Sequence, residues 1–194
     1  MANKIYAFLG PHMSGKSSMV AQLMSMGIHY IPTVTTRVFD DRYAYKRRLY
    51  QTVKSDIYKS ENLIVNTTYQ AHSYGLRKAE VLDAYKNHRV SVAIMHDVSG
   101  IAQLTKFINQ DLVTIFLMIN DEVFVDRMLR AGCTNDEIRY YVETADETGE
   151  FEHWRDVDFV VKNTSTARIA LEQILAVMGL VTLVPQADFD RLTR

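Results

Sequence analysis

The sequence predicts an α/β fold in which a parallel sheet is flanked by helices. Three runs of apolar residues, at 5–9, 90–95 and 112–119, have the length of buried strands. Continuous apolar runs of this kind are typical of parallel strands, which are covered on both faces. Segments with the apolar spacing of helices, such as 76–87, separate the runs. A chain of 194 residues is long enough for one such core.

The length and composition predict a single domain over residues 1–194, with room for a lid or an inserted lobe. The 22 Lys and Arg residues nearly balance the 23 Asp and Glu residues, so neither a nucleic acid nor a membrane is expected as a partner. Small-molecule ligands are expected, and the oligomeric state stays open. The one cysteine, Cys133, excludes an internal disulfide framework. With no signal peptide or membrane span in view, we expect a cytoplasmic protein.

The segment 10–17 fits the pattern G-x-x-x-x-G-K-[ST], directly after the first strand and before a helical segment at 18–24. Its backbone N–H groups can wrap a polyphosphate at the positive end of that helix. Lys16 then reaches the β- and γ-phosphates, and the Ser17 hydroxyl holds Mg²⁺. The pattern is typical of P-loop NTPases. The expected nucleotide-binding residues are Gly10, Met13, Ser14, Gly15, Lys16, Ser17 and Ser18.

A β-rich segment at 33–37 ends in Arg37, whose forked donors suit a second phosphate group. The basic run 46–48 is interpreted as a solvated face. Tyrosines and polar residues alternate from 43 to 74, which indicates short strands and loops. We interpret about 34–90 as an inserted substrate lobe that ends in the helix 76–87.

His96 and Asp97 follow the second core strand. Ligands of parallel sheets collect beyond the carboxyl ends of strands, so Asp97 is predicted to face the same cleft as Ser17 and to bind Mg²⁺. His96 is interpreted as a packed neighbour. A helix follows at 99–109.

Asp121 is predicted to cap the helix after the third core strand. This helix carries Arg127 and Arg130 on one side, either as a salt-bridged outer face or as part of a mobile lid over about 126–150 that brings guanidinium groups to the transferring phosphoryl group. Gly132 ends the helix. A last strand at 157–161 and a closing helix at 166–178 complete the core, and the tail from residue 179 carries no motif that we can interpret.

The phosphate loop, the T-T-R and Y-G elements that end at Arg37 and Gly75, and the segment D-V-S-G at 97–100 occur in an order that resembles the guanylate kinase family. The resemblance spans about residues 3–178. It implies a P-loop core, a GMP-binding lobe, an arginine-bearing lid and transfer of the γ-phosphate of ATP to GMP with Mg²⁺. The residues it implies at the acceptor are Thr33 near guanine, Arg37 and Tyr74 on the phosphate, Arg42 and one of Tyr43 or Tyr45 as assistants, and Asp97 near metal and acceptor.

The sequence departs from the family at three places, one of which is a shorter loop between Arg37 and the following tyrosines. Val65 stands where the family has the glutamate that recognises guanine, and the later lid arginine falls near Tyr141 or Val142, with Arg139 as a possible substitute. Loss of that carboxylate removes a charged hydrogen-bond acceptor worth about 1.5–3 kcal/mol. Two alternatives therefore stay open: a P-loop kinase for another small phosphorylated or hydroxylated acceptor, and a non-catalytic module that binds a phosphorylated peptide.

Overall fold

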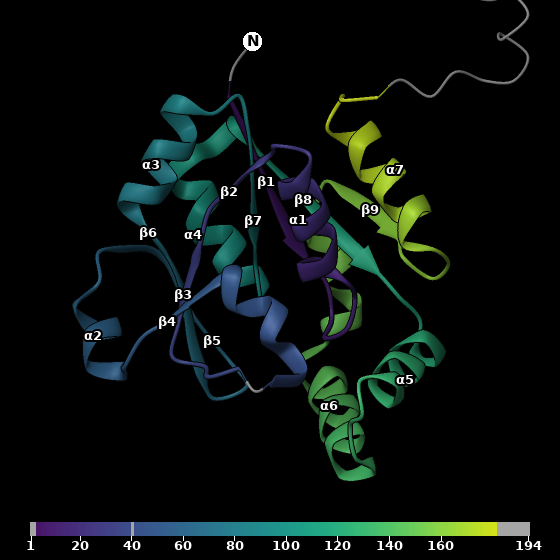
Figure 1. Cartoon of the computed structure of the whole chain (residues 1–194). Helices are drawn as coiled ribbons and strands as arrows, with labels where there is room; N and C mark the ends of the chain where they lie inside the picture. Colours follow the sequence, from purple (N-terminus) through teal and green to yellow (C-terminus); the bar gives the residue numbers. More distant parts are fainter. Residues whose placement is uncertain (1–2, 40, 182–194) are drawn as a thin grey trace, which may run out of the picture.

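The structure is a computed structural model that describes residues 3–39 and 41–181; the side chains of Arg42, Tyr43 and Tyr45 are outside this description. Its main sheet has five strands in the order β2-β7-β1-β8-β9. All neighbouring strands are parallel. The α/β fold with a parallel sheet flanked by helices is thereby confirmed (Figure 1). The strands are β1 (Lys4–Leu9), β2 (His29–Tyr30), β7 (Val90–Ile94), β8 (Leu112–Met118) and β9 (Phe159–Lys162).

Side chains of each central strand alternate between two hydrophobic clusters, one on each face of the sheet. Tyr6 and Phe8 of β1 join the cluster that contains residues of α1 (Lys16–Ser25) and α7 (Ala167–Val177). Ile5 and Ala7 join the cluster that contains residues of α3 (Lys78–Asn87) and α4 (Val98–Ile108). Because β1 is buried on both faces, the loop that follows it begins at a rigid point.

A second sheet of four strands has the order β4-β3-β6-β5 and is built from chain between β2 and α3. Its strands are β3 (Thr33–Thr35), β4 (Tyr50–Thr52), β5 (Leu63–Tyr69) and β6 (His72–Arg77). The short helices η1 (Asp41–Arg48) and α2 (Ser55–Ser60) belong to the same segment (Figure 1). In this segment the tyrosine-rich sequence forms short strands, as the sequence predicts.

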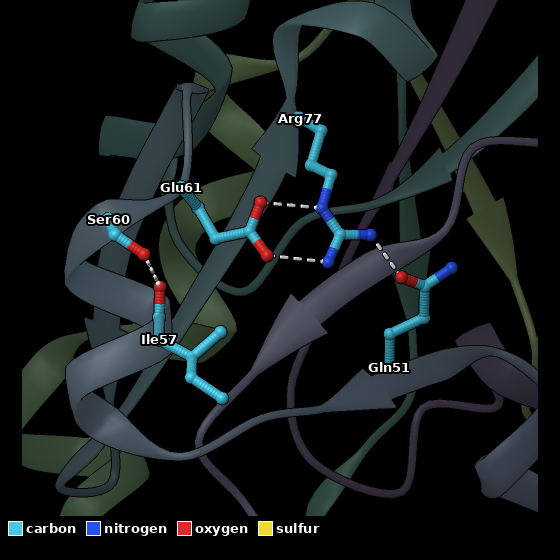
Figure 2. A network of polar contacts seen from close by, with 5 residues as sticks. All are labelled: Gln51, Ile57, Ser60, Glu61 and Arg77. Atoms are coloured by element: carbon cyan, nitrogen blue, oxygen red, sulfur yellow. Dashed lines mark hydrogen bonds and ion pairs between the residues drawn. The ribbon is translucent and has the colours of Figure 1, made fainter.

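An ion pair between Arg77 and Glu61 joins segments of this second sheet (Figure 2). Arg77 at the end of β6 donates from Nε and Nη2 to the two carboxylate oxygens of Glu61, each at 2.7 Å. Its third nitrogen donates to Gln51 of β4. The fork therefore ties the α2–β5 connection to both β6 and β4, and bidentate pairing of this kind fixes direction as well as distance.

The helices α5 (Asp121–Arg130) and α6 (Asn135–Thr148) form a hairpin that lies beyond the carboxyl end of β8 (Figure 1). Ile119, Phe124 and Met128 form its small hydrophobic core. The prediction that Asp121 caps α5 is wrong, because the side chain of Asn120 accepts the N–H of Val123 at 3.0 Å. A short helix, η3 (Glu150–Asp156), leads from the hairpin back to β9.

Two predicted boundaries move because tertiary pairing outweighs the local pattern. Leu76 pairs with Thr33 and Val65 in the second sheet, so the helix predicted from 76 begins at Lys78. The last strand begins at Phe159, after the side chain of Asp158 has accepted bonds from both N and Oγ1 of Thr114, each at 2.8 Å. In the ranges 3–39 and 41–181, no helix has the length and apolar character to cross a bilayer.

Candidate active site

The loop between β1 and α1 needs glycine at both of its ends. A Cβ on Gly10 would lie 2.6 Å from the carbonyl oxygen of Leu117, and a Cβ on Gly15 would lie 2.5 Å from Nδ2 of Asn163. Both glycines have positive φ, at 147° and 98°. Since a side chain fits neither the space nor the backbone conformation, the glycine spacing of the motif follows from the shape of the loop.

The start of α1 is open to an anion. Gly15 occupies the N-cap position without a side-chain cap, and the first turn carries no acidic residue. The first N–H groups of the helix therefore keep their hydrogen-bonding capacity, and the helix dipole favours negative charge there. These features fit the polyphosphate of a nucleotide.

The ammonium of Lys16 lies inside the loop, where it donates to the carbonyl oxygens of Gly10 and, at 2.9 Å, Pro11. Burial lowers the pKa of Lys16 to about 8, while Glu150 favours its charged form. A desolvated ammonium interacts more strongly with phosphate oxygens than a hydrated one does, because water no longer screens the pair. Lys16 is thus placed to hold phosphate.

Two side chains from distant parts of the chain support the loop. Arg127 of α5 donates to the carbonyl oxygens of Met13, at 2.9 Å, and Asn163, at 2.7 Å. The amide of Asn163, just after β9, donates to the carbonyl oxygen of Ser14 at 2.8 Å. Arg127 therefore fixes the loop through backbone contacts.

A cavity of about 370 Å³ lies beside the loop, between the carboxyl ends of the parallel strands and the end of β3. Its lining combines the loop with a cationic and aromatic wall. The wall consists of Arg37, Phe39, Lys46, Tyr50, Tyr69, Tyr74 and His96. A volume of this order suits a small ligand.

Arg37 and Lys46 supply the positive charge of this wall. Both lie over the ring of Phe39, with Arg37 Cζ at 5.5 Å and Lys46 Nζ at 5.9 Å from its centroid. Arg37 also donates to the hydroxyl of Tyr141 at 3.2 Å. Burial disfavours its charge, but the hydroxyls of Tyr74 and Tyr141 hold the pKa of Arg37 above its ordinary value. Two cations thus face the loop across the cavity, where an anion can bind.

His12 and His96 are held neutral next to these cations. Burial is the main cause that lowers the pKa of each imidazole well below its ordinary value, and the charges of Lys16, Arg37 and Lys46 add to it. The rings of His96 and Tyr74 pack in a T-shaped contact, with centroids 3.8 Å apart. Its interpretation as a packed neighbour therefore holds, and it lines the cavity as well.

His12 stands out because its Nε2 is buried without a hydrogen-bond partner among the described residues. Its backbone N–H donates to the carboxylate of Glu150 at 3.3 Å, and its ring stacks on Tyr141 of α6. The phosphate loop is thus in contact with the helical hairpin on its outer side.

The structure brings most of the predicted site residues to the cavity. The predicted residues that line it are Gly10, Met13, Ser14, Gly15, Lys16, Ser17, Ser18, Arg37, Tyr74 and Arg127. Arg130 lies elsewhere, exposed on α5 and paired with Asp126 at 2.9 Å. The predicted contributions of Arg42 and Tyr45 fall on side chains that the structure does not describe.

Thr33, Val65 and Asp97 do not line this cavity. The buried hydroxyl of Thr33 pairs with that of Tyr30 at 3.1 Å. Asp97 is the N-cap of α4, where Oδ1 accepts the N–H of Gly100 at 2.8 Å and the hydroxyl of Ser99 at 2.9 Å. Val65 is 3% exposed and belongs to the hydrophobic cluster that contains residues of α3 and α4.

The sequence analysis missed His12, Lys46 and Asn163. Asn163 follows a core strand, so the rule that places ligands beyond strand ends could have found it. Lys46 belongs to a basic run that was interpreted as a solvated face. That interpretation fits Arg47, which is exposed and pairs with Asp41 at 2.8 Å, but not Lys46, which lines the cavity. His12 occupies a variable position of the motif, where no residue type is expected.

The sheet order, the glycine-defined loop and the helix that starts from it give a fold similar to that of solved kinases. Among solved structures, guanylate kinase from Anaplasma phagocytophilum is similar, with a TM-score of 0.64, 17% identity, and coverage of 93% of this chain and 88% of that chain. Shikimate kinase from Acinetobacter baumannii, solved in complex with shikimate, has a TM-score of 0.50, 10% identity, and coverage of 93% and 96%. No protein-family model and no curated protein matches the sequence.

Proposed function

We propose that this protein transfers the γ-phosphoryl group of ATP to a nucleoside monophosphate, with GMP as the leading acceptor and Mg²⁺ as cofactor. One observation carries the proposal: the phosphate loop and a second cationic group, Arg37 and Lys46, line the same cavity. Two facing anion sites are what a reaction between two phosphate groups requires.

The donor side consists of the loop and Lys16. The amides at the start of α1 receive the polyphosphate, and the ammonium of Lys16 moves from loop carbonyls to the β- and γ-phosphate oxygens. The hydroxyl of Ser17 lines the cavity and is an oxygen ligand of the kind that Mg²⁺ prefers. The carboxylate of Asp97, which caps α4 and does not line the cavity, is proposed as the second ligand. When bound, the ion neutralises charge that develops on the transferring group.

The acceptor side consists of Arg37 and Lys46, with the hydroxyl of Tyr74 beside them. Arg37 offers a fork to a phosphate, and Lys46 adds a point charge. The phosphate of a monophosphate acceptor has a second pKa near ~6 and is already mostly ionised at neutral pH. The reaction therefore needs alignment and charge neutralisation rather than a strong base, in accord with neutral His12 and His96.

We further propose that residues 1–194 act as one kinase domain, with 34–90 as the acceptor lobe and 126–150 as a lid. Tyr141 of α6 contacts both His12 of the loop and Arg37. These contacts support a hairpin that changes position when either substrate binds. Closure would bring Arg130, which is exposed here, toward the phosphoryl group.

The burial of Val65 favours one alternative, a related acceptor without guanine. The side chain is packed in the core, and a Cβ added to Gly100 would lie 3.3 Å from it. A base that needs a carboxylate partner finds none at this position. Where the acceptor carries a phosphate group, Arg37 and Lys46 are the cations that would bind it.

A coupled assay of ADP release tests these proposals with GMP, AMP, UMP, CMP and shikimate as acceptors. Turnover with GMP above all others supports the leading proposal, and turnover with another acceptor selects the alternative. ATP binding without turnover on any acceptor would contradict both and favour the binding module. Lys16→Ala serves as the inactive control, since it removes the ammonium from the loop.

A further inference from the structure

A cluster of metal-ligating side chains lies away from the cavity. His29 of β2, Asp83 of α3 and His88, which follows α3, have ligand atoms that all lie within 4.8 Å of one another. His29 pairs in register with Ser91, at the amino-terminal end of β7, whereas the cavity opens at the carboxyl ends of the strands. The cluster therefore belongs to a separate place on the molecule, at the edge of the main sheet.

The two imidazole rings are stacked face to face, with centroids 3.7 Å apart and planes 7° apart. Nδ1 of His29 lies 3.1 Å from the hydroxyl of buried Ser91. With Nδ1–H donating to this hydroxyl, the lone pair of His29 is on Nε2. An outer-shell hydrogen bond of this kind fixes the tautomer and direction of a ligating imidazole.

The carboxylate of Asp83 completes the set. Its Oδ2 lies 3.4 Å from Nε2 of His88, and its Oδ1 accepts the side-chain amide of Asn87 at 2.7 Å. The chain thus gathers two imidazoles and one carboxylate from an edge strand, a helix and the residue after that helix.

Two carboxylates bring negative charge to the cluster. Asp83 and Glu80, both on α3, act electrostatically on His29. Carboxylates beside imidazole rings favour a bound cation.

We propose that His29, Asp83 and His88 bind a divalent transition metal ion of the zinc class, which clips the edge strand β2 to the end of α3. Two nitrogens and one oxygen are a donor set for Zn²⁺, Ni²⁺ or Cu²⁺, while Mg²⁺ and Ca²⁺ prefer oxygen alone. With three protein ligands, Zn²⁺ keeps a fourth position for water. The rings tilt out of the stack on binding, because their lone pairs lie in the ring planes and have to converge on one ion.

The test is a titration of the full chain, treated with chelator, with Zn²⁺ in a calorimeter, together with thermal unfolding at the same metal concentrations. The expected result is one equivalent of bound Zn²⁺ and a melting temperature raised by several degrees, because the ion binds the folded state alone. Excess Mg²⁺ should not displace it. Titration with Co²⁺ gives visible absorption that reports on nitrogen and oxygen coordination.

Variants assign the ligands. His29→Ala and His88→Ala should each abolish tight binding, and Asp83→Asn, at an exposed position, should weaken it at least about tenfold without harm to the fold. Ser91→Ala should weaken it about tenfold through loss of the outer-shell bond. His153→Ala is the matched control and should bind as the unmodified protein does. Absence of Zn²⁺ binding, or binding that Asp83→Asn and His29→Ala leave unchanged, would overturn the proposal.

Discussion

The ring of Tyr141 lies flat on the imidazole of His12, with centroids 4.1 Å apart and planes 5° apart. This contact joins the hairpin to the phosphate loop, and the hydroxyl of the same tyrosine accepts a hydrogen bond from Arg37. One side chain of the hairpin therefore touches both the phosphate loop and Arg37 of the cavity wall. The resemblance to guanylate kinases places an arginine near this position; here a tyrosine orients an arginine from another element.

Tyr141→Phe removes the hydroxyl and keeps the stack on His12. We expect the KM for the acceptor to rise about five- to tenfold, because one hydrogen bond of about 1 kcal/mol no longer orients Arg37. Steady-state kinetics with varied acceptor measure this change. Tyr140→Phe, at the exposed neighbouring position, is the control. An acceptor KM that stays the same in Tyr141→Phe would exclude this orienting role.

Asp97→Asn separates the cap of α4 from the proposed metal ligand. Asparagine caps a helix about as well as aspartate does, so the melting temperature should change little. The kcat should fall at least about tenfold and the Mg²⁺ requirement should rise, because an amide is a poorer ligand than a carboxylate. Asp97→Ala should in addition cost about 1 kcal/mol of stability through loss of the cap. Full activity of Asp97→Asn would remove this residue from the metal site.

Arg127→Ala and Arg130→Ala should differ although both arginines lie on α5. Loss of Arg127 leaves the carbonyl groups of Met13 and Asn163 without their charged donor, which should cost about 1.5–3 kcal/mol and raise the KM for ATP. Loss of Arg130 removes an exposed ion pair worth about 0.3–0.5 kcal/mol, so stability should hold while kcat falls. Equal melting temperatures for the two variants would contradict the role of Arg127 as a support of the loop.

Lys16→Met should change how stability depends on pH. The pKa of Lys16 is lowered to about 8 from its ordinary value of 10.5, so between these values the unfolded chain binds a proton that the folded protein has lost. The contribution of Lys16 to the free energy of unfolding therefore increases as the pH rises from about 8 to 10.5. Lys16→Met should be more stable than the unmodified protein below pH 8, with an advantage that shrinks toward pH 10.

Denaturant unfolding from pH 7 to 10 measures this difference, and the exposed Lys59→Met is the matched control. The Lys16→Met variant should lack phosphoryl transfer at every pH. A stability difference that stays constant over this range would show that the ammonium is hydrated in the folded protein.

The sequence was sufficient for β1, β7 and β8 because each of these buried strands is a largely apolar run. The boundaries at Leu76 and Asp158 were not predictable from local pattern, since partners on other strands decide them. The cap of α5 was misplaced by one residue because Asn120 and Asp121 are both good caps, and only the backbone geometry chooses between them.

The candidate site divides in the same way. The loop was predictable because its chemistry is contained in eight consecutive residues. The wall was predictable only in part. Arg37 and Tyr74 were expected at the site, whereas Tyr50, Tyr69 and His96 come from three different strands or strand ends, and each alone has the pattern of an ordinary core residue. Lys46 and Arg47 are neighbours in η1, but only Lys46 lines the cavity, and the local sequence does not indicate which of the two does so.

The supports of the phosphate loop also set an order of events for the newly made chain. Asn163 holds Ser14 across 149 positions of sequence, and Arg127 holds Met13 across 114. Nearly the whole core must therefore leave the ribosome before the loop at residues 10–17 can take its final conformation. Nucleotide capture should begin only late in synthesis, when β9 has emerged and joined the sheet.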